Sequence, residues 1–503
     1  MKAFHLNLSF LPFVAQLVAA SSTLFTGGTI VGYDQSTESL EIIRNGSVLI
    51  EDDRVVALYP PGGYSSVPKK TEIIDVAGKI ITPGFIDTHR HGWQTAYKTF
   101  GSNMSMIEYF FRYQELFAGA PFSADDVYIG QLAGLYESLN AGVTTTLDHA
   151  QHTWSPSTSR AGFRASVDSG ARVFWAYAIR PAPNFTVTQQ IADFKAIVNE
   201  SDLDGTATSI GLAYDTWGPD PNMTEVNAII SLAKSSNVSV LTTHSMQGPW
   251  GLTNSPADLH RYGILNTSIP VIFSHGSVLT AHDATLLRST NQYLSITPES
   301  EMHYGQSHPR SHLIQDQGSL GVDTHFAFSI DILTQARLWL QKTRSLLYTP
   351  VVDQQWKLPK NSPMSADQAF LLATRNGGLA LRRPDLGVLA PGAKADLIVW
   401  NSDSPGMLGW VDPVAAVILH ANVGDIQHVL VDGKFVKRDF RLTVPDYNEV
   451  QKRFLKSARR IQSWYAEQPG PTIPEEMGGF PIIEIDTMDV QRGDGNAYGG
   501  LNY

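Results

Sequence analysis

The sequence predicts an α/β protein: a (β/α)8 TIM barrel with a small β-sandwich domain built from both chain ends. From residue 83 to residue 385, short apolar runs alternate with segments of helix length, which is typical of parallel βαβ units. On both sides of this region, short β-rich runs alternate with turn signals, which is typical of antiparallel sheets. We expect the barrel at 83–385 and the β-sandwich domain at 21–82 and 386–445.

The β-sandwich domain is predicted from β-rich runs at 29–31, 47–50, 54–58 and 79–81 near one end of the chain. Similar runs return at 395–400 and 428–436, where Asp432 and Gly433 form a hairpin signal between two apolar stretches. After Pro445, apolar residues at helical spacing predict an amphipathic helix. Pro, Gly and Asp dominate from Gln468 onward. The segment 446–503 is therefore expected to be a C-terminal helix followed by an irregular tail.

The barrel is predicted from eight apolar runs, at 85–91, 143–149, 173–178, 210–214, 238–244, 271–275, 293–297 and 320–325. Several of these runs end in His or Asp. Because a barrel of this kind carries its active site at the carboxyl ends of its strands, we expect functional side chains at these positions.

The first twenty residues resemble a secretory signal peptide. Lys2 is followed by a largely apolar stretch at 8–17 and by small residues that end at Ala20, the expected cleavage point. A membrane anchor is less favoured, since the apolar stretch is short for a bilayer and is interrupted by polar residues. Acceptor triplets for N-glycosylation begin at Asn45, Asn103, Asn184, Asn199, Asn222, Asn237 and Asn266. We expect a secreted glycoprotein, although several triplets could remain unused.

Composition and charge exclude several classes of function. The formal net charge is −11 and there is no run of Lys or Arg, so nucleic acids and anionic membranes are not expected as partners. The chain contains no Cys, which excludes disulfides, a thiolate nucleophile and a Cys-type zinc site. A small-molecule substrate is the expected partner.

Five metal-competent side chains stand at the ends of four predicted strands. His89 and His91 are two apart on one strand, so they share a face and can bind one ion. His244 and His275 each close an apolar run, and Asp323 follows another. A single strand His is more often a hydrogen-bonded core residue than a ligand, and an H-x-H pair alone is a weak signal. Their arrival from separate strands at one barrel end favours a metal site.

The chain is similar to the amidohydrolase superfamily, in the branch of the triazine hydrolases and the cytosine- and guanine-type deaminases. The segments that carry the resemblance are PGFIDTHRH at 83–91, LFTGGTI at 24–30 and PGAKADLIV at 391–399. The resemblance implies that His89, His91, His244 and Asp323 bind the metal. It also implies that His275 hydrogen-bonds the attacking water or the substrate. Asp323 would act as general base within reach of that water.

The resemblance implies a single ion. Binuclear members use a carboxylated lysine on the fourth strand, and the segment 209–215 contains no lysine. Three imidazoles and a carboxylate suit Zn²⁺, with Fe²⁺ as the alternative.

The sequence departs from the deaminase pattern after the fifth strand. Deaminases of this branch place a glutamate three residues after the strand histidine, and this chain has Gln247 there. Glutamine cannot shuttle a proton. Glu299 is the candidate replacement acid, and His149, Gln247, Glu301 and His303 are candidate substrate contacts, although surface or structural roles are comparably plausible for each.

Three functions remain open. The first is metal-dependent hydrolysis of a C–N bond in an amide, an amidine or a heteroaromatic ring. The second is deamination of an aminated heterocycle, with Glu299 or Glu301 in place of the missing glutamate. The third, from another class, is a catalytically silent barrel that acts as a binding protein. Many members of the superfamily are oligomers, so a homo-oligomer is compatible with the resemblance.

Overall fold

The computed structural model describes residues 22–64, 67–218, 220–251, 253–306 and 310–485. The predicted signal peptide, 1–20, lies outside the described residues, as does the end of the predicted tail, 486–503.

Eight parallel strands form the barrel, which confirms the predicted fold class. They are β6 (Phe85–Arg90), β7 (Val143–Ala150), β8 (Arg172–Ile179), β9 (Ser209–Tyr214), β10 (Leu241–Met246), β11 (Val271–Ser277), β12 (Tyr293–Ile296) and β13 (Gly318–Leu320). Neighbouring strands pair in sequence order. The ring closes because the amides of Val322 and Asp323 both donate to the carbonyl oxygen of His89, at 3.0 and 2.8 Å.

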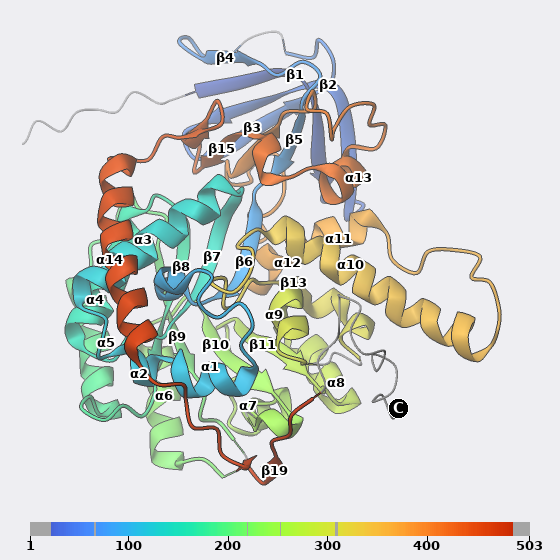
Figure 1. The fold of residues 1–503 in the computed structure, drawn as a ribbon. Helices are drawn as coiled ribbons and strands as arrows, with labels where there is room; N and C mark the ends of the chain where they lie inside the picture. Colours follow the sequence, from blue (N-terminus) through green and yellow to red (C-terminus); the bar gives the residue numbers. More distant parts are fainter. Residues whose placement is uncertain (1–21, 65–66, 219, 252, 307–309, 486–503) are drawn as a thin grey trace, which may run out of the picture.

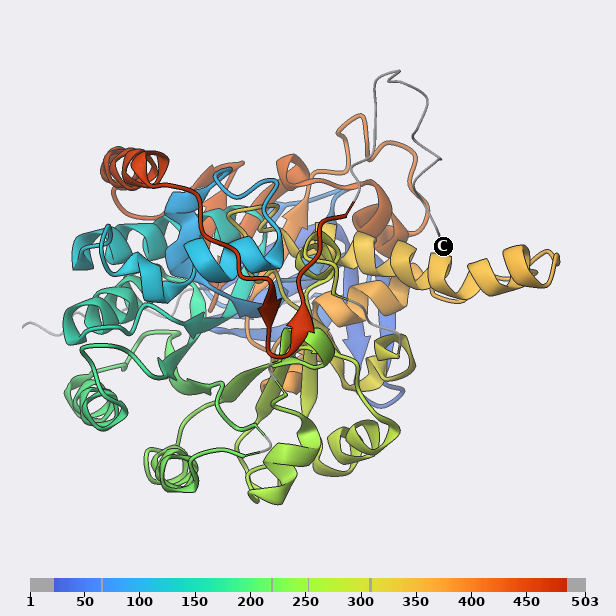
Figure 2. The same ribbon diagram turned by 60° about the horizontal axis from the view of Figure 1, so that its bottom comes forward.

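Helices on the outside of the barrel connect the strands (Figures 1 and 2). The first connection contains η1 (Gly92–Tyr97), α1 (Met106–Arg112), α2 (Glu115–Ala118) and α3 (Ala124–Asn140). The next ones contain α4 (Pro156–Asp168), α5 (Val187–Glu200), α6 (Met223–Ser235), η2 (Gly248–Trp250), α7 (Pro256–Arg261), α8 (Ala281–Thr290) and α9 (Pro298–His303). The helices α10 (Ile332–Thr349), α11 (Ala366–Ala373) and α12 (Arg375–Ala380) follow β13.

The last barrel strand is shorter and earlier than predicted. The sequence predicts a strand at 320–325, whereas β13 ends at Leu320. Gly321 then passes so close to β6 that a Cβ atom there would lie 2.9 Å from the backbone of His89. Asp323 has a φ of 58°, in the left-handed region that L-residues seldom adopt. The chain therefore leaves the extended conformation before it reaches Asp323.

The two chain ends form one hydrogen-bonded sheet of nine strands above the barrel (Figure 1). Its strands are β1 (Ser22–Asp34), β2 (Ser39–Glu51), β3 (Arg54–Tyr59), β4 (Glu72–Asp75), β5 (Ile80–Pro83), β14 (Leu397–Trp400), β15 (Ile426–Val431), β16 (Lys434–Arg438) and β17 (Arg441–Leu442). The ends meet where β5 pairs antiparallel with β14. Asp432 and Gly433, with φ of 47° and 71°, form the turn between β15 and β16.

A buried ion-pair network attaches this sheet to the barrel. The Arg172 guanidinium, at the start of β8, donates to both carboxylate oxygens of Asp396 at 2.9 and 3.0 Å. It also donates to Asp432 at 2.5 Å. Because a buried guanidinium is costly without such partners, this fork fixes the β domain at the amino ends of the strands. The opposite, carboxyl end stays free for a site.

The segment after Pro445 contains the helix α14 (Tyr447–Glu467), which lies along α3. The Tyr465 and Tyr97 hydroxyls are 2.8 Å apart, and Ser457 donates to Asp126 at 2.6 Å. Where the sequence predicts an irregular tail, β18 (Glu476–Met477) and β19 (Phe480–Pro481) form a small hairpin. Figures 1 and 2 place this hairpin at the end of the barrel opposite the β domain.

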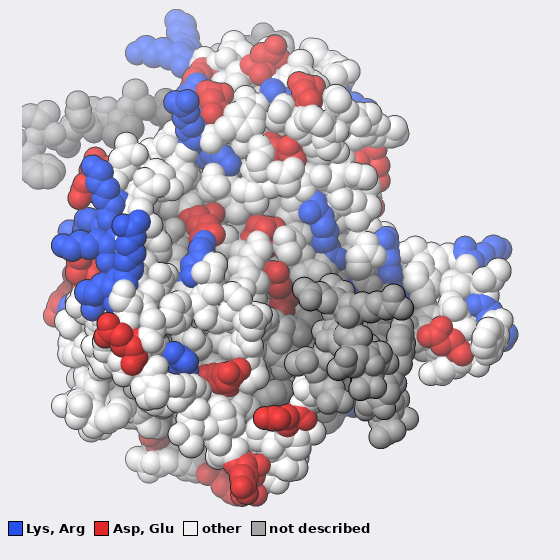
Figure 3. All heavy atoms as spheres, in the orientation of Figure 1, with Lys and Arg blue, Asp and Glu red and all other residues white. Residues whose placement is uncertain are grey.

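Basic side chains on the face shown in Figure 3 gather along α14. Two of them are paired with acidic residues of α3, since Arg453 contacts Asp125 and Arg460 contacts Asp126. Among the described residues, no helix is long and apolar enough to cross a bilayer.

Candidate metal centre

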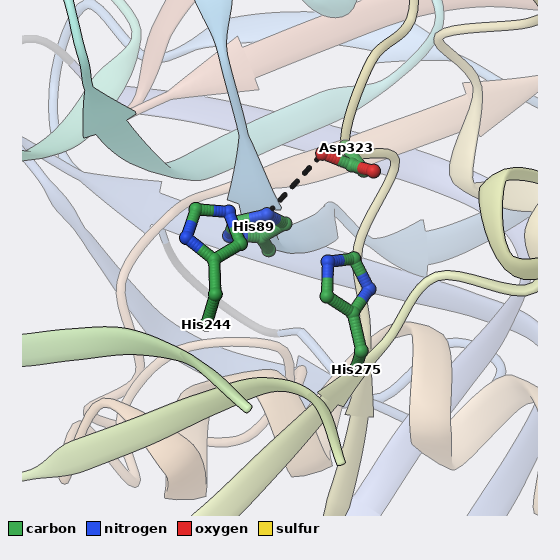
Figure 4. A group of neighbouring side chains, drawn as sticks. All are labelled: His89, His244, His275 and Asp323. Carbon is green, nitrogen blue, oxygen red and sulfur yellow. Dashed lines mark ion pairs between the residues drawn. The ribbon is translucent and has the colours of Figure 1, made fainter. Parts of the chain in front are cut away.

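The carboxyl ends of the barrel strands bring the predicted metal ligands together. His89 lies on β6, His91 directly after it, His244 on β10, His275 on β11, and Asp323 after β13. Figure 4 shows four of these side chains pointing toward one another. The imidazole of His89 lies 4.9 Å from that of His244 and 5.2 Å from that of His275, between ring centroids. Asp323 Oδ1 is 3.3 Å from His89 Nε2 and 3.1 Å from His91 Nε2.

Two of these residues have unusual backbone conformations. His275 has a φ of 75° and Asp323 a φ of 58°. Non-glycine residues adopt this left-handed region at a cost of about 1–3 kcal/mol, which the surrounding fold must offset. Such residues cluster at functional sites. Here the conformation turns both side chains into the cluster.

Hydrogen bonds behind the imidazoles fix which nitrogen faces the centre. His91 Nδ1 donates to the carbonyl oxygen of His149 at 3.0 Å, and His244 Nδ1 donates to the Asp215 carboxylate at 2.9 Å. In its neutral form, each ring therefore carries its hydrogen on Nδ1 and its lone pair on Nε2. These two Nε2 atoms lie 3.3 Å apart. Two lone pairs at this distance favour a cation between them.

The remaining donors also suit a metal ion. Nε2 of the fully buried His89 lies 3.3 Å from Asp323 Oδ1 without making a hydrogen bond to it. Ligand atoms of His89, His244, His275 and Asp323 all lie within 4.8 Å of one another. Burial holds the pKa of His89 well below its usual range, so the ring is neutral and able to coordinate. The cluster therefore has the nitrogen and carboxylate donors that a divalent metal requires.

The two oxygens of the Asp323 carboxylate face different groups. Burial by itself would raise the pKa of Asp323, but the neighbouring imidazoles of His89, His91 and His275 outweigh it and hold this pKa well below its usual range. Oδ1 faces these imidazoles, while Oδ2 accepts a hydrogen bond from the Ser300 hydroxyl at 2.5 Å. The carboxylate is therefore fixed at both oxygens.

A short relay fixes His275. Its Nδ1 lies 2.9 Å from the Thr297 hydroxyl, which lies 3.2 Å from Glu301 Oε1. The Thr297 hydroxyl donates its hydrogen to Glu301, so its oxygen accepts from His275 Nδ1. His275 Nε2 is then the acceptor nitrogen. Glu301 is fully buried behind this relay, and its role as a substrate contact stays a prediction.

Glu299 lies apart from the cluster, and its role as the replacement acid stays a prediction. Its carboxylate accepts a hydrogen bond from the Gln335 side chain on α10 at 3.0 Å, and its amide donates back to Gln335 at 3.0 Å. Burial raises the pKa of Glu299, but the side chain faces a neighbouring helix.

The other predicted substrate contacts differ in how far they are buried and in what they pack against. His149 is buried inside the cluster, with its ring 4.4 Å from that of His244. Gln247 is half-buried directly after β10. His303, at the end of α9, packs against the rings of Tyr304 and Phe328, 4.7 and 5.8 Å away between centroids.

Polar and aromatic side chains that the sequence did not predict surround the cluster. Arg180, directly after β8, donates to the carbonyl oxygen of Gln151 at 2.8 Å and pairs with Glu115 on α2. Burial lowers the pKa of Arg180 to about 9. Burial also raises the pKa of Tyr109, with a contribution from the charge of Asp323. The connections after β6 and β8 therefore place polar groups beside the cluster.

An aromatic wall stands beside these groups. The Tyr109 ring lies 5.9 Å from Tyr304 and 6.4 Å from Phe326, between ring centroids. Tyr109 also accepts a hydrogen bond from Gln94 at 3.0 Å. Flat apolar surfaces with a few placed polar atoms suit a planar ring as ligand.

Comparisons with known proteins agree with this geometry. The model of the amidohydrolase family matches residues 80–436. The 5'-deoxyadenosine deaminase of Methanosarcina mazei is 25% identical over 437 residues, which are 83% of this chain and 94% of that protein. The 5-methylthioadenosine/S-adenosylhomocysteine deaminase of Symbiobacterium thermophilum is 26% identical over 451 residues, 86% of this chain and 98% of that protein.

Solved structures show the same fold. The zinc complex of atrazine chlorohydrolase from Arthrobacter aurescens superposes with a TM-score of 0.73 at 20% identity, over 87% of this chain and 100% of that one. A zinc-bound adenosine deaminase from Xanthomonas campestris gives a TM-score of 0.74 at 17% identity, over 88% and 99%. The family match spans most of the chain. The chain therefore belongs to the amidohydrolase family and is a metal-dependent hydrolase that acts on carbon–nitrogen bonds other than peptide bonds.

Proposed function

We propose that the protein uses one zinc ion, held by His89, His91, His244 and Asp323, to deaminate a heteroaromatic ring hydrolytically. The observation that carries this proposal is that several imidazole nitrogens converge on one carboxylate. Hydrogen bonds on the far side of the rings set their tautomers. When bound, such an ion lowers the pKa of a water ligand and polarises the carbon under attack. Catalytic zinc can take a fifth ligand, so a water could bind beside these four donors, and His275 is left to act on that water or on the substrate.

The chain's own residues handle the proton. Asp323, anchored by Ser300, accepts the proton of the attacking water and delivers it to the departing amine. His275, with Nε2 as its acceptor nitrogen, orients the same water. The relay through Thr297 to Glu301 keeps the His275 ring in that orientation.

The substrate class follows from the surroundings of the cluster and from the relatives. The aromatic wall at Tyr109 suits a planar ring, and Arg180 with Glu115 suits a polar substituent on it. The two relatives described above carry names of adenosine-type deaminases. An aminated purine or a related ring is therefore the proposed substrate.

One observation favours a second candidate, hydrolysis of an amide or amidine. Gln247 occupies the position from which a glutamate would protonate a ring nitrogen. An amide carbonyl under attack needs no ring protonation. The test is a panel of aminated heterocycles, assayed for ammonia release, beside amides, assayed for acid release, with the zinc-loaded protein. Turnover of neither group would contradict both candidates and favour a binding protein.

Restoring a carboxylate at position 247 is expected to raise ring deamination. In Gln247→Glu, the side chain can donate a proton to a ring nitrogen, and such acid catalysis contributes about 10²–10⁴-fold in enzymes. We expect ammonia release to rise at least about 10-fold, with amide hydrolysis unchanged. The control is Gln451→Glu on the exposed side of α14, which adds the same charge far from the cluster. An unchanged rate in Gln247→Glu would argue against a proton-donor position there.

We also infer that the protein is secreted and N-glycosylated. The seven predicted acceptors, Asn45, Asn103, Asn184, Asn199, Asn222, Asn237 and Asn266, are all exposed, which supports this inference. When the protein is made in a eukaryotic secretory host, we expect enzymatic removal of N-linked glycans to lower its mass. A mass equal to that of the bare polypeptide before treatment would contradict the inference.

A further inference from the structure

A carboxylate that the sequence reasoning did not single out lies directly behind the metal cluster. Asp215 follows β9, and its Oδ2 atom is 2.9 Å from His244 Nδ1 and 3.3 Å from His149 Nε2. Its Oδ1 atom accepts hydrogen bonds from the His244 amide at 2.7 Å and from the Thr243 hydroxyl at 3.2 Å. Asp215 therefore holds both the backbone and the ring of His244.

His149 links the same carboxylate to a second ligand. Its imidazole lies beside Asp215, while its backbone carbonyl oxygen accepts the Nδ1 hydrogen of His91 at 3.0 Å. The His149 ring is 99% buried and lies 4.4 Å from the ring of His244. Asp215 and His149 together therefore contact the imidazoles of His91 and His244, the two rings whose Nε2 atoms face each other.

We propose that Asp215 is a positioning residue of the metal centre, which acts by keeping the hydrogen of His244 on Nδ1. A neutral imidazole carries one hydrogen, so a carboxylate that accepts it at Nδ1 leaves the Nε2 lone pair for the metal. This inference rests on the proposed metal-dependent function and goes beyond it, since it assigns metal affinity to a side chain that is not a ligand.

The substitution Asp215→Asn tests this role with little change of volume. The His244 amide would still need an acceptor, so the Asn oxygen takes the Oδ1 position and the NH₂ group faces His244 Nδ1. Nδ1 must then accept, which moves the ring hydrogen to Nε2, toward the centre. Loss of such an outer partner typically costs about 10–100-fold in metal affinity.

The experiment measures the zinc dissociation constant of the full chain by competition with a chromogenic chelator, together with zinc per chain. We expect Asp215→Asn to weaken zinc binding by about 10–100-fold. Asp215→Glu, which restores a carboxylate, should recover part of the loss. The control is Asp439→Asn, which alters a carboxylate 3.8 Å from His428 in the β domain and should leave affinity unchanged. Thermal unfolding of the zinc-free proteins checks that each variant folds.

Three results would overturn the proposal, and they have different meanings. Unchanged zinc affinity in Asp215→Asn, with tight binding by the unaltered chain, would remove the positioning role alone. In a second result, the unaltered chain binds two ions, and Asp215→Asn and His149→Gln each lose one of them. Asp215 and His149 would then be ligands of a second ion. If the unaltered chain binds no zinc, the proposed function fails as well. No substrate is needed, so an incorrect substrate class does not affect the outcome.

Discussion

Replacing Asp323 by Asn is expected to lower kcat by about 10²–10⁴-fold, because a general base contributes that much to a hydrolytic step. The Asn side chain can keep an oxygen facing His89 and His91, and its volume is nearly that of Asp. The fold should therefore persist. It cannot take a proton from the water, and its NH₂ group would replace the oxygen that accepts from Ser300. The measurement is kcat and KM on the best substrate of the panel, with zinc per chain determined in parallel.

The matched control is Asp316→Asn, which removes a carboxylate paired with Arg288 on the protein surface. We expect it to change kcat by less than a factor of about two, since exposed ion pairs contribute little. Asp323→Asn with full zinc and near-normal kcat would refute the proton-transfer role. Loss of zinc in this variant would show that Asp323 acts mainly as a ligand.

Most of the barrel could be predicted because its strands are buried on both faces. β8 has no exposed residue, and after Arg172 it appears in the sequence as a continuous apolar run. The last strand could not be delimited in this way. Asp323 is buried and follows an apolar run, but its left-handed φ of 58° ends the extended conformation. The hydropathy of a residue indicates whether the residue is buried, but it says little about the backbone angles of that residue.

The convergence of these side chains could be predicted because parallel strands deliver their carboxyl ends to one place, whatever the details of packing. The groups that orient the ligands could not. Ser274, which lies 2.7 Å from His89 Nδ1, and Thr297 are common residue types without a distinctive pattern. Asp215 does carry the useful signal, since it directly follows a predicted strand.

The two glutamates show how local structure decides a role. Glu299 and Glu301 stand two residues apart just after the predicted strand at 293–297, and the sequence does not indicate which way either side chain points. The structure places both on the helix α9, in which residues two apart point to different faces. Glu301 therefore faces Thr297 and His275, while Glu299 faces Gln335 on α10.

Removing the metal is expected to abolish turnover and to destabilise the fold. Dialysis against a chelator should leave less than about 1% of the activity, and about one equivalent of Zn²⁺ should restore it, because the ion supplies the nucleophile. A ligand that binds only the folded state stabilises it by about 4 kcal/mol when present at 1,000 times its dissociation constant. The measurement is the zinc-dependent rise in Tm, with activity assayed on the same samples.

This rise should depend on the cluster itself. Without an ion, the Nε2 atoms of His91 and His244 lie 3.3 Å apart with no cation between them, an arrangement that a bound cation should relieve. His91→Asn should therefore lose most of the zinc-dependent shift, while His260→Asn, on the exposed side of α7, should keep it. A shift of equal size in both variants would mean that zinc stabilises the protein from elsewhere. Full activity of a metal-free chain would contradict a metal-dependent mechanism.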